Sequence, residues 1–179
     1  MYKNGELIFY GGTGVCRVEG TETRPDKGGA REYYILKPIC QSGTIYIPVD
    51  TQVYMRPVIS REEAERLIDA IPGVKAEEIH ERSFTQLAAH YEQLIARHDC
   101  DSLLQLLVSI RAKKRYAESC GRNFGQLDTR YLKRAAPLFF GELSAALHID
   151  HDSVQPSIPK RLAHKQHTPT HATPGRTLT

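Results

Sequence analysis

The sequence contains no tryptophan, only two methionines and no long apolar run. None of its apolar stretches approaches the ~20 residues that a helix needs to span a bilayer. The first residues, MYKNGELIF, also lack the basic segment followed by an apolar segment that marks a secretory signal peptide. Together these absences predict a cytoplasmic protein.

Cysteine is scarce as well: the chain has four, widely spaced, without a CxxC pair. In a reducing cytosol we expect these thiols to stay free, and their spacing does not match a structural zinc motif. The glycine-rich run at residues 11–14 lacks the Lys-Ser/Thr that completes a P-loop. No pattern places Ser, His and Asp together. We therefore expect a protein that is not an enzyme and that uses no cofactor and no metal.

Charge is distributed unevenly along the chain, although the net charge is only +3. Residues 60–81 carry three Lys/Arg against seven Asp/Glu, whereas residues 111–134 carry eight Lys/Arg against two Asp/Glu. A basic segment of this kind in a soluble chain indicates an oriented anionic partner, and nucleic acid is the obvious candidate.

The first third of the chain has the pattern of a small, strongly bent β module of four or five strands. It spans Gly5–Val49, and apolar residues alternate along its last strand. Pro48 cannot donate a ladder hydrogen bond, so this strand is expected at a sheet edge. An open edge beside exposed Tyr46 and Arg24 is a place where another sheet could add a strand.

Four helices are expected after the β module. Ser60 and Glu63 fit a capping box for a first helix from Arg61 to about Ala70. The others are expected to begin at Ser83, at an N-cap Asp101 and at an N-cap Asp128, the third ending near Cys120-Gly121 and the fourth at Ile149.

Two further features concern the end of the chain. Pro137 falls inside the fourth helix and is expected to kink it, at a cost of about 3 kcal/mol unless packing compensates. The Pro-, Thr- and His-rich residues after His151 are expected to be mostly disordered. The predicted domains are therefore a β domain over 1–56, a helical domain over 57–150 and a disordered tail over 151–179.

Several motifs carry a resemblance to a known family. They are Gly5–Tyr10, Gly14-Val15, Tyr33–Leu36 and Ile45–Val49. This pattern resembles the CarD family of bacterial transcription regulators over about Tyr2–Ile149, more specifically in the first third than in the helices. The resemblance implies an α+β protein, with a small Tudor-like β-barrel followed by an all-α helical bundle. It also implies that the first domain binds the RNA polymerase β subunit and that the helical domain contacts promoter DNA.

The resemblance also suggests which residues make these contacts. For polymerase they are Arg24 and Tyr46, together with Ile47 and Pro48, which follow Tyr46 in the sequence. Family members carry a Trp wedge for the upstream edge of the transcription bubble, and Phe84 stands where that Trp is expected. Phenylalanine also serves as an apolar wedge between base steps, but Phe84 is equally in helical phase with the core.

The basic segment supplies the remaining candidate DNA contacts. If the third and fourth helices are antiparallel, their basic residues meet at one end of the bundle, where phosphates would be attracted; the alternative is a solvated basic face. The full set of candidate DNA contacts is Arg82, Phe84, Arg111, Lys113, Lys114, Arg115, Arg122, Arg130, Lys133 and Arg134.

The function expected from this resemblance is that of a monomeric regulator associated with the nucleoid through RNA polymerase. It would dock on the β subunit, contact upstream promoter DNA with low sequence specificity and modulate open-complex stability. Two alternatives remain open. One is a protein–protein adaptor that does not contact DNA. The other is a barrel that binds RNA. The charge of residues 1–59 is nearly neutral, with seven basic and six acidic residues, which argues against RNA binding.

Overall fold

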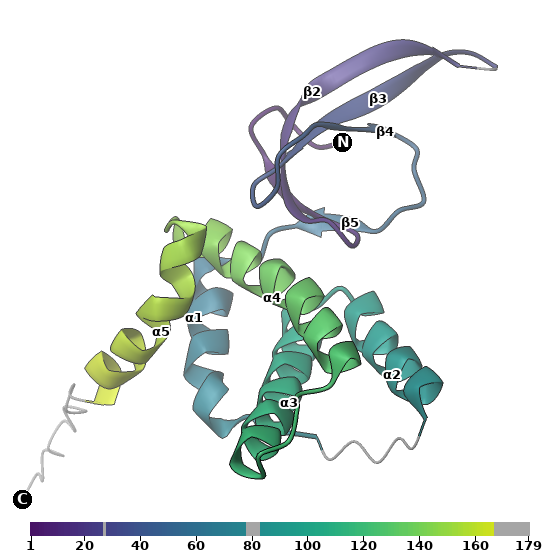
Figure 1. The fold of residues 1–179 in the computed structure, drawn as a ribbon. Helices are drawn as coiled ribbons and strands as arrows, with labels where there is room; N and C mark the ends of the chain where they lie inside the picture. Colours follow the sequence, from purple (N-terminus) through teal and green to yellow (C-terminus); the bar gives the residue numbers. More distant parts are fainter. Residues whose placement is uncertain (27, 78–82, 167–179) are drawn as a thin grey trace, which may run out of the picture.

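A computed structural model places a small β-sheet against one end of a layer of helices (Figure 1). The structure describes residues 1–26, 28–77 and 83–166. Across these ranges, no helix is both long enough and apolar enough to cross a lipid bilayer. The α+β class expected from the sequence is confirmed.

The sheet has five antiparallel strands in the order β4-β3-β2-β1-β5. The strands are β1 Leu7–Tyr10, β2 Gly14–Asp26, β3 Gly29–Pro38, β4 Ile45–Pro48 and β5 Met55–Pro57. The end strands β4 and β5 are four and three residues long and do not pair with each other, so the sheet is open. The predicted Tudor-like barrel is therefore not confirmed.

The two faces of the sheet pack against different partners. Ile8, Val18, Tyr34 and Leu36 are buried in a cluster that belongs to the sheet alone. Phe9, on the opposite face of β1 from Ile8, is buried in the same cluster as the helices. One face of the sheet therefore joins the hydrophobic core of the helical layer, while the other face has a buried cluster of its own.

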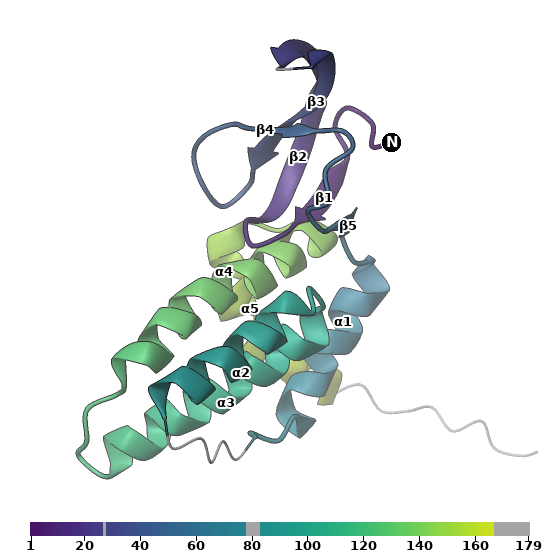
Figure 2. The same cartoon turned by 90° about the vertical axis from the view of Figure 1, so that its right-hand side faces the viewer.

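The helices follow the sheet in chain order. They are α1 Arg61–Ala70, the 3₁₀ turn η1 Ile71–Gly73, α2 Phe84–Ala96, α3 Cys100–Ser119, α4 Gln126–Leu147 and α5 His151–Gln166. Figure 2 shows α2, α3 and α4 side by side, with the C-terminal half of α4 beneath the sheet. Glycines permit this close approach: a Cβ on Gly14 would lie 3.1 Å from the Leu138 side chain, and one on Gly141 would lie 3.0 Å from the Cys40 sulfur.

The first two N-caps agree with the sequence. Ser60 and Glu63 form a full capping box at α1, which runs to Ala70 as expected. Ser83 caps α2, and its side chain accepts a hydrogen bond from the Gln86 N–H over 3.2 Å.

The other two predicted N-caps are wrong. Asp99, not Asp101, caps α3, because Asp99 accepts from the Ser102 N–H over 2.6 Å while Asp101 pairs with Arg66 on α1. Gly125, not Asp128, caps α4. The Asp128 side chain is unavailable as a cap because it is buried between helices, where it serves as an acceptor.

The prediction of a disordered tail is wrong for residues 151–166, which form α5. Val154 and Ile158 lie one turn apart on α5 and are 0% and 9% exposed in the helical core. Two apolar residues at helical spacing thus dock a segment whose Pro-rich composition favours disorder. The remainder of the predicted tail, 167–179, lies outside the described residues.

Candidate functional site

The outer face of the sheet brings together two of the predicted polymerase contacts. Arg24 on β2 and Tyr46 on β4 lie on either side of β3, and the Arg24 guanidinium carbon sits 3.5 Å from the centre of the Tyr46 ring. Arg24 also pairs with Glu22 over 3.2 Å. Tyr46 is 41% exposed. The stacked pair is a preformed amphipathic surface of the type enriched at protein interfaces.

The open edge of β4 has few main-chain groups available for pairing with another strand. The Val49 N–H bonds the Glu32 C=O over 3.0 Å. By antiparallel alternation, Tyr46 and Pro48 then direct their main-chain groups away from β3. Pro48 has no N–H, and its C=O accepts from the Thr51 N–H over 3.0 Å. Within β4, the outward donor and acceptor of the edge are therefore concentrated at Tyr46. The expected edge position of Pro48 is confirmed.

Ile47 faces the opposite way from Tyr46. Its side chain is 6% exposed and packs in the sheet's own cluster with Tyr34 and Leu36. Ile47 therefore anchors β4 to β3, and its side chain is not part of the outer face.

The predicted basic cluster divides into two halves. In the first half, Lys113 on α3 donates to Asp128 Oδ1 on α4 over 2.7 Å and to the Tyr91 hydroxyl on α2 over 3.1 Å. The Tyr91 hydroxyl donates to the same Asp128 oxygen over 2.6 Å. Burial, followed by the hydrogen bond to Asp128, raises the pKa of Tyr91. This contact joins three helices, and the charge of Lys113 is balanced by the Asp128 carboxylate within the protein.

Two more cations of this half contact other side chains of the protein, Arg134 through a carboxylate and Arg130 through an aromatic ring. Arg134 on α4 pairs with Glu92 on α2, which also accepts from the Tyr131 hydroxyl over 2.8 Å. The Arg130 guanidinium carbon lies 5.1 Å from the centre of the Tyr131 ring. We call Lys113, Arg130 and Arg134 the paired half of the cluster.

The other half lines an open groove between α3, α4 and α5. Its cations are Arg111, Lys114, Arg115 and Lys133, and Gln155 of α5 completes the wall. We call this surface the basic groove. Glu118 is its acidic lining residue and lies 3.9 Å from the Lys114 ammonium. Among the described residues, no ion pair is recorded for the other three cations.

Burial and a neighbouring cation both disfavour the charge of Arg111 in the groove. Burial, and then the neighbouring Arg115 cation, lower the pKa of Arg111. Arg111 also lies over the Phe140 ring, 5.6 Å from its centre, which fixes its stem against the core. A bound anion would relieve both the desolvation and the repulsion of these cations.

The remaining DNA candidates lie away from the groove. Phe84 is 77% exposed in the first turn of α2, so it is not a core residue. Arg122 is exposed in the connection between α3 and α4. Arg82 lies outside the described residues.

Sequence reasoning missed three features. Gln155 lines the basic groove from a segment expected to be disordered, and Tyr116 is 65% exposed next to Arg115. The third is an ion pair between Arg56 and Glu142 that links the sheet to α4. An exposed aromatic within a basic run could have drawn attention to Tyr116, but no local pattern reveals the other two. Within the described ranges, no group of three His, Cys, Asp or Glu residues is placed to hold a metal.

The fold and these surfaces define a class of protein: a small open sheet with an amphipathic edge, joined to a helical layer that carries a basic groove. Comparison with known families is consistent with this class. Residues 2–59 match the family model described as the CarD-like/TRCF RID domain. The chain thus carries a CarD-like domain of the kind that interacts with RNA polymerase, and the resemblance carried by its first third is confirmed.

Proposed function

We propose that the chain is a CarD-like transcription regulator that docks on the RNA polymerase β subunit and contacts upstream promoter DNA. The outer face at Arg24 and Tyr46, with the open edge of β4, makes the polymerase contact. The basic groove holds DNA phosphates, and Phe84 props the upstream edge of the bubble. The protein thereby modulates open-complex stability.

The single observation that supports DNA contact best is the basic groove. Four cations converge there, and among the described residues that line the groove Glu118 is the one carboxylate. Such a surface binds a polyanion through counterion release, without reading sequence. Tethering to polymerase raises the local DNA concentration, so this contact need not be tight alone.

The test is a binding measurement on promoter DNA with polymerase present. The variant Lys114→Glu/Arg115→Glu/Lys133→Glu reverses three exposed groove cations, and we expect a loss of roughly 100-fold or more in affinity, with a shallower salt dependence. The matched control Lys75→Glu/Arg97→Glu/Lys160→Glu reverses three exposed cations of the helical layer outside the groove. Equal loss in both variants, or no loss in the groove variant, contradicts groove binding.

The polymerase contact is tested on the full chain. A fragment ending near residue 58 would expose Phe9 and leave Arg56 without its carboxylate partner. We expect Tyr46→Ala and Arg24→Glu to weaken binding to the isolated β subunit, with the exposed Lys3→Glu as control. If both variants bind as the wild type does, the docking assignment is wrong.

Phe84 offers a prediction of its own. Because the side chain is 77% exposed, Phe84→Ala should change the free energy of unfolding by less than about 0.5 kcal/mol. We expect the same variant to shorten the lifetime of open promoter complexes and Phe84→Trp to lengthen it, since a larger wedge stacks better. Competitor-challenge kinetics measure both. Lifetimes that do not depend on this residue contradict the wedge.

The alternative function is a protein–protein adaptor. It is favoured by the paired half of the basic cluster, whose cations contact carboxylates and aromatic rings of the chain itself. Under this alternative, exposed Phe84 contacts a second protein, and the groove variant binds promoter complexes as the wild type does.

A further inference from the structure

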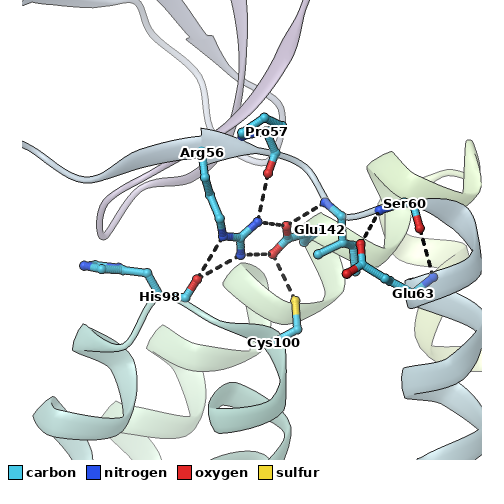
Figure 3. Close-up of polar contacts among 8 residues, drawn as sticks. Arg56, Pro57, Ser60, Glu63, His98, Cys100 and Glu142 are labelled. Carbon is cyan, nitrogen blue, oxygen red and sulfur yellow. Dashed lines mark hydrogen bonds and ion pairs between the residues drawn. The ribbon is translucent and has the colours of Figure 1, made fainter.

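Within the described residues, an ion pair between Arg56 and Glu142 joins the sheet to the helical layer. Arg56 of β5 contacts both carboxylate oxygens of Glu142 in α4, and its Nη2 donates to Oε2 over 2.8 Å (Figure 3). Its Nε and Nη2 also donate to the His98 C=O, just after α2, over 3.1 and 2.9 Å. One side chain thereby ties the sheet both to α4 and to the connection between α2 and α3. We call Arg56 and Glu142 the junction pair.

The Glu142 carboxylate is fully enclosed and fully bonded. Its side chain is 0% exposed, and that of Arg56 is 19% exposed. Besides Arg56, Oε1 accepts from the Ile59 N–H over 3.1 Å and Oε2 from the Cys100 thiol over 3.0 Å. Burial, and then the Glu142 charge, raise the pKa of Cys100, which keeps its thiol protonated as a donor. Each oxygen therefore has two donors, which come from β5, from the segment between β5 and α1 and from the start of α3.

The junction pair supplies directional polar contacts at this interface, where the Tyr54 and His98 rings also stack with their centres 4.6 Å apart. The other contacts between sheet and helices are largely apolar, as at Phe9 and Val15, which lie in the shared core. Apolar burial is non-directional, whereas a bidentate guanidinium–carboxylate pair fixes an orientation in its plane. The Arg56 guanidinium also lies over the Phe9 ring, 4.5 Å from its centre, so the apolar and polar contacts meet at one point.

We infer that Arg56 and Glu142 are positioning residues that set the orientation of the basic groove relative to the docking edge of the sheet. This inference rests on the proposed function. Lys133 of the groove lies on α4, nine residues before Glu142, which is a rise of about 14 Å. Arg56 belongs to the same continuous sheet as Tyr46. The junction pair therefore lies on a rigid path between the two contact surfaces.

A fixed orientation matters because the DNA contact is weak alone. Docking makes DNA binding effectively intramolecular only if the groove already points at the template. If the helical layer could pivot on an apolar interface, part of this advantage would be lost as orientational freedom. The junction pair removes that freedom before binding.

The test uses the full chain with Arg56→Met and Glu142→Leu combined. Replacing both charges with apolar side chains of similar size avoids a buried unpaired charge, so the chain is expected to fold. The matched control is Arg66→Gln with Asp101→Asn, which removes an ion pair of 3.2 Å between α1 and α3 inside the helical layer.

Residual dipolar couplings of the backbone amides measure the orientation directly. We expect one alignment tensor to fit both the sheet and the helices in the wild type and the control, and two tensors in the double variant. A single shared tensor in the double variant overturns the inference.

Binding measurements give the functional readout. We expect the double variant to bind the β subunit alone and DNA alone with affinities within about twofold of those of the wild type. Polymerase increases the DNA affinity of the wild type, and we expect this increase to be at least roughly tenfold smaller in the double variant. A purely structural role would weaken both separate affinities together, and that result, or an unchanged gain, overturns the inference. If polymerase provides no gain even in the wild type, the proposed function fails, and the dipolar couplings still decide whether the pair sets the orientation.

Discussion

The two halves of the basic cluster come from the same segments of α3 and α4 but differ in what they contact. Lys113 and Lys114 are adjacent in the sequence, as are Lys133 and Arg134. Lys113 and Arg134 bond carboxylates of neighbouring helices, whereas Lys114 and Lys133 line the basic groove. The difference teaches that a run of basic residues is not one surface. Helical geometry directs neighbouring positions about 100° apart, so one stabilises the bundle while the next remains available for an anion.

The largest expected effect is on the free energy of unfolding, and it tests whether the two halves of the cluster differ. Lys113→Glu would place a second carboxylate against Asp128, which is 7% exposed. We expect the free energy of unfolding to fall by about 3 kcal/mol, the low end for a broken buried pair because Lys113 itself is partly exposed. Lys114→Glu should cost less than about 0.5 kcal/mol, since its contact with Glu118 is an exposed i,i+4 pair.

Urea denaturation followed by circular dichroism measures both variants under one condition. Asp128→Asn serves as a control, because it removes the charge without adding repulsion and should fall between the two. Equal losses for Lys113→Glu and Lys114→Glu would show that the cluster is one solvated face, and the division into halves would be wrong.

A smaller effect is expected in DNA binding, where adjacent residues of the two halves can be compared directly. Lys133→Ala should lower the slope of log affinity against log salt by about 0.9, the value for one lost phosphate contact. Arg134→Ala should leave that slope unchanged, because its guanidinium is held by Glu92. Fluorescence anisotropy over a salt series compares the two variants, and a similar change for both would place Arg134 on the DNA surface too.

Local features of the fold were predictable from the sequence, and contacts between distant segments were not. The α1 boundaries follow from a capping box whose two members are three residues apart, and the edge position of Pro48 follows from its missing N–H. Asp128 also had the chemistry of an N-cap. Its true partners, Tyr91 and Lys113, are 37 and 15 residues away, and only tertiary packing reveals them.

The same limit applied to the candidate site. Charge density and strand alternation are local properties, so the sequence alone predicted the basic segment and the outward side of Tyr46. The choice of Arg24 and Tyr46 as polymerase contacts came mainly from the family resemblance. It did not separate the two halves of the cluster, since the carboxylate that holds Arg134 comes from α2. Gln155 was missed because the polar, Pro-rich composition around it outweighed Val154 and Ile158, the two apolar residues that dock α5.

The smallest expected effect is the contribution of Glu92, the partner of Arg134 in the paired half, to the pH dependence of stability. Partial burial raises the pKa of Glu92, but hydrogen bonds from Arg134 and Tyr131 outweigh it and hold the pKa below the ordinary 4.5. A carboxyl group with a lowered pKa stabilises the folded state above its unfolded pKa, and this contribution is lost as pH falls through the folded pKa. We therefore expect the wild type to melt at a higher temperature than Glu92→Gln at pH 6, with the difference shrinking below pH 4.5. Melting curves from pH 6 to pH 3 measure it. Glu118→Gln is the matched control, because an exposed pair such as Lys114 and Glu118 contributes little to stability. A Glu92→Gln difference that stays constant with pH would mean that Arg134 is not held by a charged partner, and Arg134 would then have to be counted with the groove.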